Sequence, residues 1–274
     1  MKQIIAFILL VSGCYGSVEQ PVHFRLEKGY LIVAKCSIGD LEDLTAIVDT
    51  GVTETVVDST ILQRLRLVAK SDTAIFVAKE APVQSVLLPS VSFGPIRIIS
   101  VRAITTDLSG LTRQFGFRPD VLIGMDVLHR SSFTIDYKAR VLTFDLNTSF
   151  SHAASLLDGG RFVIVEAVVS GQTVRLQLDT GLSGLVVFED RLRKQLSTGS
   201  QAGPATLSGV AASFDTNTIS NQQLRVGNWT GYQLPIIVID RRSQFAEFDG
   251  LLGARILTSN RLCLDFTHMM MYWD

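Results

Sequence analysis

The triplet Asp-Thr-Gly occurs twice in the 274-residue chain, at 49–51 and at 179–181. Average residue usage predicts this tripeptide only about 0.05 times in a chain of this length. An apolar run leads into each triplet, at 46–48 and at 176–178, so each aspartate is expected where a buried strand opens into a turn. The glycine permits a tight turn with backbone amides aimed at the carboxylate. A carboxylate held in this way is suited to general acid–base chemistry.

The elements around the triplets repeat along the chain. Each copy has a strand-like run before its triplet, an apolar pair after it, a hydrophobic segment ending in glycine and, twelve residues later, a further aspartate. These landmarks are 30–33, 56–57, 121–124 and Asp136 in the first copy, and 162–165, 186–187, 250–253 and Asp265 in the second. From the triplet's aspartate to the glycine, the separation is 75 residues in the first copy and 74 in the second. The sequence therefore indicates a tandem duplication.

Between these landmarks the hydrophobic pattern has a period of two residues. Runs such as 97–104 and 132–137 are rich in β-branched and aromatic residues and are expected to be strands. Only short stretches favour helices, at 58–67, 125–130 and 189–196. The sequence therefore predicts a mostly β protein of two similar lobes with a few short helices.

With these motifs the chain resembles the aspartic peptidases of the pepsin and retropepsin type, and most closely exported bacterial retropepsin-like proteins. The resemblance extends from Tyr30 to Phe266. It implies two tandem retropepsin-like β-barrel lobes, related by a pseudo-twofold axis in a pepsin-like bilobal arrangement. In that family each lobe supplies one Asp-Thr-Gly loop, and the segments at 121–124 and 251–253 match the element that packs behind it.

The resemblance implies an aspartic endopeptidase, a hydrolase that cleaves polypeptide without a metal or cofactor. Asp49 and Asp179 would be the catalytic pair in the cleft between the lobes. Two adjacent carboxylates share one proton, so one acts as general base on a bound water while the other polarises the scissile carbonyl. The sequence does not assign the proton. The triplets' threonines would cross-brace the loops and their glycines would allow the turns: Thr50, Thr180, Gly51 and Gly181.

Two departures from the family pattern leave a second function open. The residue after the triplet is usually small, and here it is Val52 in the first copy and Leu182 in the second, where leucine is bulky enough to crowd a substrate. Active members close a glycine-containing hairpin over the substrate. Residues 203–209 fit such a hairpin, whereas 74–79 contain no glycine. The alternative is a non-catalytic peptide-binding module, although buried paired carboxylates cost stability and binding does not need them.

The N-terminal segment is predicted to be an export signal. Its apolar run at 4–11 is shorter than the roughly 20 residues that span a bilayer, but it suits a secretory signal. Residues 11–14 resemble a bacterial lipobox, in which Cys14 would be lipidated, and cleavage after Gly16 is the alternative. We therefore expect the protein in the periplasm or cell envelope, with or without a lipid anchor.

The predicted organisation is a signal peptide at 1–16, a linker or short pro-segment at 17–29, a first lobe at 30–148, a linker at 149–160 and a second lobe at 161–274. We expect a monomer in which the two lobes of one chain pair. The alternative is that each copy pairs with its counterpart in another chain.

Composition narrows the class of protein further. Hydrophobic residues make up 47% of the chain and charged residues 19%, which supplies a core and lacks the signature of disorder. The net charge of -1, without a basic stripe, argues against a nucleic-acid partner. The three cysteines exclude a disulfide-framework mini-protein, and the four histidines have no metal-ligand spacing. Polypeptide stays the expected partner.

Other residues that could do chemistry are expected to be structural. They are Asp126 at the start of a short helix, Asp136 and Asp265 on the outer faces of strands, and His129 on the surface. No nucleophile-elbow motif accompanies the histidine. Cys36 and Cys263 are expected to be buried thiols in strands, and the sequence does not show whether they form a disulfide. The tail at 269–273 is expected to be a final strand.

Overall fold

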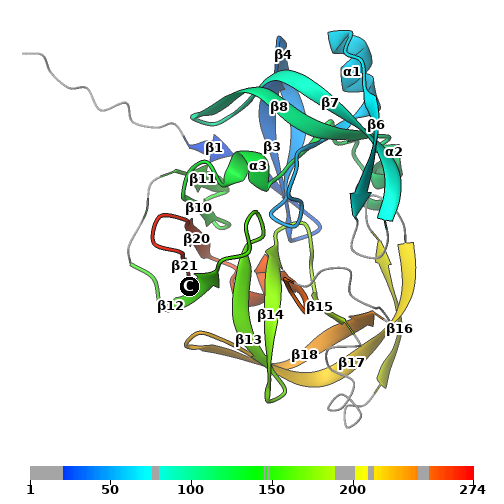
Figure 1. Ribbon diagram of the computed structural model, residues 1–274. Helices are drawn as coiled ribbons and strands as arrows, with labels where there is room; N and C mark the ends of the chain where they lie inside the picture. The colour runs from blue at the N-terminus through cyan, green and yellow to red at the C-terminus, as the bar shows by residue number, and fades with distance from the viewer. Residues whose placement is uncertain are drawn as a thin grey trace, which may run out of the picture.

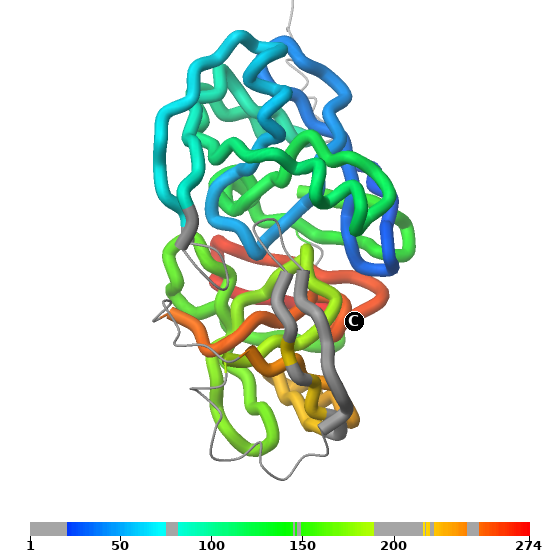
Figure 2. Tube along the Cα trace, turned by 90° about the vertical axis from the view of Figure 1, so that its right-hand side faces the viewer, coloured from blue at the N-terminus to red at the C-terminus, as the bar shows by residue number. Residues whose placement is uncertain are grey.

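The computed structural model describes residues 21–75, 80–144, 146, 149–188, 201–208, 213–239 and 247–274. The predicted signal at 1–16 and the predicted helix at 189–196 lie outside these residues. In the described parts, no helix is both long and apolar enough to cross a membrane. The chain is mostly β, and its two halves form two lobes, one above the other in Figure 2.

The first lobe contains a closed barrel of six strands. In order around the barrel they are β3 (Leu31–Ile38), β4 (Leu41–Val48), β9 (Val121–Ile123), β5 (Val56–Asp58), β8 (Ile96–Thr106) and β7 (Glu80–Phe93). The barrel closes because β3 pairs with β7 as well as with β4. Two further strands extend the sheet, β2 (Arg25–Glu27) and β6 (Lys70–Ile75). The helices are α1 (Ser59–Leu65), α2 (Ser109–Phe115) and α3 (Met125–Leu128), of which α1 and α3 lie where helices were predicted.

The second lobe repeats this barrel with the same strand order. Its strands are β13 (Ile164–Val169), β14 (Gln172–Asp179), β19 (Gly250–Gly253), β15 (Leu185–Phe188), β18 (Trp229–Ile239) and β17 (Ser213–Val226), and β13 closes it by pairing with β17. The remaining elements are the outer strand β16 (Gln201–Ser208) and α5 (Ala254–Leu257). The predicted fold, two tandem β-barrel lobes with a few short helices, is confirmed (Figure 1).

A six-stranded sheet joins the lobes. Its order is β1 (Val22–His23), β11 (Val141–Thr143), β10 (Phe133–Asp136), β20 (Arg261–Asp265), β21 (Met270–Trp273) and β12 (His152–Leu157). At its centre Thr134 pairs with Cys263, and these two residues occupy equivalent positions in the two copies. A pair of equivalent residues on antiparallel strands marks the pseudo-twofold axis, which therefore passes between them.

This sheet also changes how two predicted segments are understood. The segment 149–160, predicted as a linker between the lobes, contains β12, and the described part of the predicted linker or pro-segment at 17–29 contains β1 and β2. These segments pair in register with other strands, so they are structural members of the sheets. The predicted final strand is β21.

The core explains why the strands before the triplets read as apolar on both faces. One hydrophobic cluster runs through both lobes and takes Val48 from β4 and Leu178 from β14. A smaller cluster on the other side of β4 takes Ile47. A strand covered on both faces has few sites for polar side chains, so it forms a rigid support for the loop that follows.

Cys36 and Cys263 confirm the expectation of buried thiols. They lie in β3 and β20, and neither forms a disulfide. Burial raises the pKa of the Cys36 thiol to about 12, which keeps it protonated and unreactive.

Candidate active site

The strands β4 and β14 carry the two aspartates to one place between the lobes. β9 runs parallel beside β4, and β19 runs parallel beside β14. These neighbours end in the glycines of the repeated hydrophobic segment. A Cβ on Gly124 would lie 2.8 Å from the carbonyl carbon of Glu54, and one on Gly253 would lie 2.5 Å from the carbonyl oxygen of Leu182. The loops after the triplets pack directly on these positions, which is why the segment ends in glycine.

The two carboxyls lie next to each other across the pseudo-twofold axis. A Cβ on Gly51 would lie 2.5 Å from the Cγ of Asp179, and one on Gly181 would lie 3.0 Å from the Oδ2 of Asp49. Each aspartate also accepts a hydrogen bond from the amide of its own loop, at 2.8 Å from Gly51 and 2.7 Å from Gly181. The structure therefore brings together the predicted pair and places both glycines where a side chain has no room.

The side chains of Thr50 and Thr180 form hydrogen bonds between the two loops. The Oγ1 of Thr50 accepts from the amide of Thr180 at 3.1 Å and donates to the carbonyl of Leu178 at 2.9 Å. The Oγ1 of Thr180 accepts from the amide of Thr50 at 3.1 Å and donates to the carbonyl of Val48 at 2.8 Å. Both side chains are buried, so these four bonds are shielded from water. They hold the two loops in one fixed relation.

The environment of the pair favours one shared proton. Burial raises the pKa of both Asp49 and Asp179 above the ordinary value for aspartate. The charge of Asp49 raises the pKa of Asp179 further, and the hydrogen bond between the two carboxyls allows them to share one proton. Opposing these effects, the loop amides lower both pKa values, with Leu182 adding a second amide on Asp179. Burial and the charge of Asp179 also raise the pKa of the nearby Tyr30 hydroxyl.

Gln177 reaches the site, and the sequence analysis missed it. It lies in β14 two residues before Asp179, is only 2% exposed, and its Nε2 donates to the carbonyl oxygen of Gly51 at 3.1 Å. A polar residue inside the apolar run 176–178 was the signal for it. A buried strand admits such a residue at low cost only when its polar atoms find partners.

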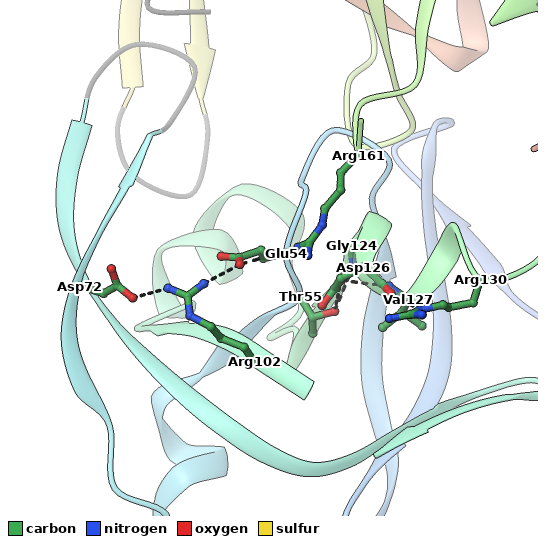
Figure 3. A network of polar contacts seen from close by, with 9 residues as sticks. All are labelled: Glu54, Thr55, Asp72, Arg102, Gly124, Asp126, Val127, Arg130 and Arg161. Atoms are coloured by element: carbon green, nitrogen blue, oxygen red, sulfur yellow. Dashed lines mark hydrogen bonds and ion pairs between the residues drawn. The ribbon is translucent and has the colours of Figure 1, made fainter. Parts of the chain in front are cut away.

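A charged network surrounds Glu54 in the first loop (Figure 3). Arg102 of β8 pairs with both Glu54, five residues after Asp49, and Asp72 of β6. Arg161 reaches Glu54 from the second lobe, at 3.8 Å. The loop is thus connected to its own lobe's outer hairpin and to the partner lobe.

A second arginine of the second lobe also crosses to the first. The Nε of Arg255 in α5 donates to the carbonyl of Gly29 at 3.0 Å, and its guanidinium lies over the ring of Tyr137 at 4.6 Å. Arg255 is equivalent to Asp126 of the first copy, and the strand register makes Arg161 equivalent to Tyr30, so neither contact has a symmetric counterpart.

The residues expected to be structural lie away from the pair. Asp126 accepts from the hydroxyl of Thr55 at 2.8 Å at the start of α3. Asp136 accepts from the amide of Ala139 in a turn. Asp265 accepts from the backbone and ring of His268. The ring of His129 lies against Phe266, with centroids 4.4 Å apart. In the described part of the chain, no group of three or more histidine, cysteine or acidic side chains is placed to hold a metal ion.

Both lobes have the outer hairpin that the sequence left open. In the first, β6 pairs with β7 up to Ile75 opposite Glu80, so these two strands form the arms of a hairpin. In the second, β16 pairs with β17 up to Ser208 opposite Ser213, so residues 203–208 form one arm of the hairpin rather than the hairpin of their own that the sequence suggested. The tips, 76–79 and 209–212, lie outside the described residues.

The bulky residue of the second loop has a place in the fold. Leu182 packs against the smaller hydrophobic cluster of its lobe, which includes Phe188 and Phe248. In the first loop, the carbonyl of Val52 accepts from the amide of Met125 at 2.9 Å, which ties the loop to α3. The departures from a small residue are therefore accommodated by contacts within each lobe.

Comparison with known proteins agrees with this geometry. A family model described as aspartyl protease matches the chain twice, over residues 34–127 and 165–256. One match falls in each lobe, and each contains one Asp-Thr-Gly triplet. No curated protein matches the chain significantly.

Proposed function

The chain belongs to the retropepsin-like aspartyl protease family, and we propose that it is an aspartic endopeptidase whose catalytic pair is Asp49 and Asp179. The observation that carries the proposal is the juxtaposition of the two carboxyls. A Cβ on either triplet glycine would meet the aspartate of the other lobe. Four buried hydrogen bonds of Thr50 and Thr180 fix this arrangement, which suits a reaction that depends on preorganised groups.

The pair would act on a water molecule bound between its two carboxyls. The ionised aspartate takes a proton from the water as its oxygen attacks the scissile carbonyl carbon, and the protonated aspartate donates to the carbonyl oxygen. The tetrahedral intermediate, a gem-diol, then loses its amine: the C–N bond breaks, a proton passes from the pair to the nitrogen, and one hydroxyl proton of the gem-diol passes back to the pair. The products are a carboxylic acid and an amine, and the pair again shares one proton.

Several features of the site support turnover over binding alone. Burial raises the pKa of both carboxyls, which costs stability, and a module that only binds peptide has no use for that cost. Leu182, the residue that favoured a binding module, packs against the second lobe's own cluster. The substrate class of this proposal is polypeptide.

The test is cleavage of a quenched-fluorescent peptide library by the purified protein between about pH 3 and pH 7. Asp49→Asn and Asp179→Asn should each abolish cleavage while the far-ultraviolet circular dichroism stays unchanged. Asp43→Asn is the matched control, because Asp43 is exposed and has a φ of 57°, which asparagine tolerates. It should keep full activity.

Two outcomes would contradict the proposal. Cleavage that survives either dyad variant would place the chemistry elsewhere. A folded wild-type protein that cleaves no peptide at any pH would instead favour the peptide-binding module.

A further inference from the structure

The dyad is built from two nearly identical loops, yet one buried side chain breaks their symmetry. Gln177 in β14 and Ile47 in β4 occupy equivalent positions, two residues before their aspartates, and each is 2% exposed. Gln177 carries two amide hydrogens, whereas Ile47 carries no donor. Only the first loop, which carries Asp49, can therefore receive a hydrogen bond from this position of the other lobe.

Gln177 acts on the backbone that holds Asp49. Its Nε2 donates to the carbonyl oxygen of Gly51 at 3.1 Å and approaches that of Thr50 at 3.5 Å. The carbonyl of Thr50 and the amide of Gly51 are the two ends of one peptide group. That amide is the donor to Asp49, at 2.8 Å. The glutamine thus lies at the far end of a hydrogen-bonded path that ends on the Asp49 carboxylate.

Such a path favours charge on Asp49. A donor at a peptide carbonyl polarises the peptide group, and its N–H then becomes a stronger donor. A stronger hydrogen bond to a carboxylate stabilises the ionised form. The second loop holds Asp179 through the Gly181 amide in the same way, but Ile47 has no donor to offer its peptide carbonyls.

We propose that Gln177 is a positioning residue that makes the dyad asymmetric, so that Asp49 is the ionised general base and Asp179 carries the proton in the resting enzyme. This inference rests on the proposed peptidase function and assigns the two roles within it.

The charged surroundings of the pair agree with this assignment. Burial raises the pKa of both carboxyls, and the charge of Asp49 acts to raise the pKa of Asp179. Among the described residues, Tyr30 is a further titratable group near the pair, and because burial and the charge of Asp179 raise its pKa, its hydroxyl stays protonated and neutral.

The first test removes the donor and keeps the length of the side chain. In Gln177→Met, ionised Asp49 is less stabilised, so the acid limb of the kcat profile should move to higher pH by about 0.5 unit. The matched control is Gln222→Met, because Gln222 is also a buried glutamine of the second lobe and bonds the hydroxyl of Ser170. The control should leave the acid limb unchanged.

The second test moves the donor to the other loop. In the double variant Ile47→Gln/Gln177→Ile, the acid limb should return towards the wild-type position. The two aspartates should also exchange roles. Carboxyl ¹³C resonances, assigned through the Asn variants, would show Asp49 ionising before Asp179 in the wild type and after it in the double variant.

The outcomes separate the two proposals. An unchanged acid limb in Gln177→Met, or Asp179 ionising first in the wild type, would overturn the role of Gln177 and leave peptidase activity standing. If the wild type cleaves no peptide, the proposed function fails, and the order of the two carboxyl titrations still decides the inference. If the double variant does not fold, Gln177→Met alone decides it.

Discussion

The cross-brace between the loops allows a quantitative prediction for Thr180→Val. Valine has nearly the shape of threonine, so the substitution removes the hydroxyl and little else. Two bonds disappear: the one donated to the carbonyl of Val48 at 2.8 Å and the one accepted from the amide of Thr50 at 3.1 Å. The Thr180 side chain is 1% exposed, so water cannot easily replace either partner.

The expected loss follows from those two partners. A typical intramolecular hydrogen bond contributes about 1 kcal/mol net, and a buried donor or acceptor left without a partner costs about 1–3 kcal/mol. Two backbone groups left without partners therefore predict a decrease of about 2–6 kcal/mol in the free energy of unfolding. Activity should fall as well, because the second loop carries Asp179 and loses its anchor.

Urea denaturation followed by tryptophan fluorescence would measure this loss, since the chain has two tryptophans and Trp273 is fully buried. The matched control is Thr45→Val in β4. That hydroxyl is partly exposed and accepts only at 3.4 Å from the exposed Lys35, so its loss should cost less than about 0.5 kcal/mol. If Thr180→Val were no less stable than Thr45→Val, the cross-brace would not hold the loops, and the reasoning would be refuted.

Three further predictions concern the same frame. In Gly51→Ala, the added Cβ would lie 2.5 Å from the Cγ of Asp179, so activity should fall about 100-fold. Gly110→Ala in α2, where a Cβ meets nothing within 4 Å, should keep full activity. Equal rates of the two variants in a peptide-cleavage assay would contradict this prediction. Because burial and the charge of Asp49 raise the pKa of Asp179, the native state binds a proton that the unfolded chain has lost above about pH 4. The free energy of unfolding should therefore decrease as pH rises through the raised pKa, and urea titrations of Asp179→Asn should lack that decrease; a profile parallel to the wild type would argue against the shift. Burial acts to raise the pKa of Asp58, the buried N-cap of α1, but its hydrogen bonds and a nearby guanidinium together lower it. Asp58→Ala should cost about 3 kcal/mol at neutral pH, and the difference from the wild type should shrink as pH falls below about 4; a difference independent of pH would exclude an ionised cap.

Much of the fold could be predicted because the same motifs occur in both halves of the sequence. The triplets, the apolar runs before them and the glycine-ended segments behind them are local patterns, and their equal spacing indicates two equivalent lobes. The neighbouring aspartates follow from that symmetry, since equivalent loops meet on the axis that relates them. No local sequence pattern marks β12 and β1 as strands, because each becomes part of a sheet only by pairing with a strand that is distant in the chain.

The features that escaped prediction are those where the two copies differ. Gln177 reads as one polar residue in an apolar strand, and its partner, the carbonyl of Gly51, lies 126 residues away. The pairing of Arg161 with Glu54 likewise joins residues far apart in the chain. No local pattern reports such a contact, since its two members are brought together only by the packing of the lobes.

The contacts that cross between the lobes also bear on the history of the duplication. Gln177, Arg161 and Arg255 all belong to the second lobe and all reach groups of the first. Their equivalents in the first lobe are Ile47, Tyr30 and Asp126, none of which carries a side-chain amide or a guanidinium. Two copies of the first lobe would therefore lack these three contacts, and two copies of the second would have no Glu54 to receive Arg161, because Gly184 stands there. The two halves are therefore complementary to each other rather than to themselves, and a gene cut back to a single repeat would encode a dimer without these three contacts.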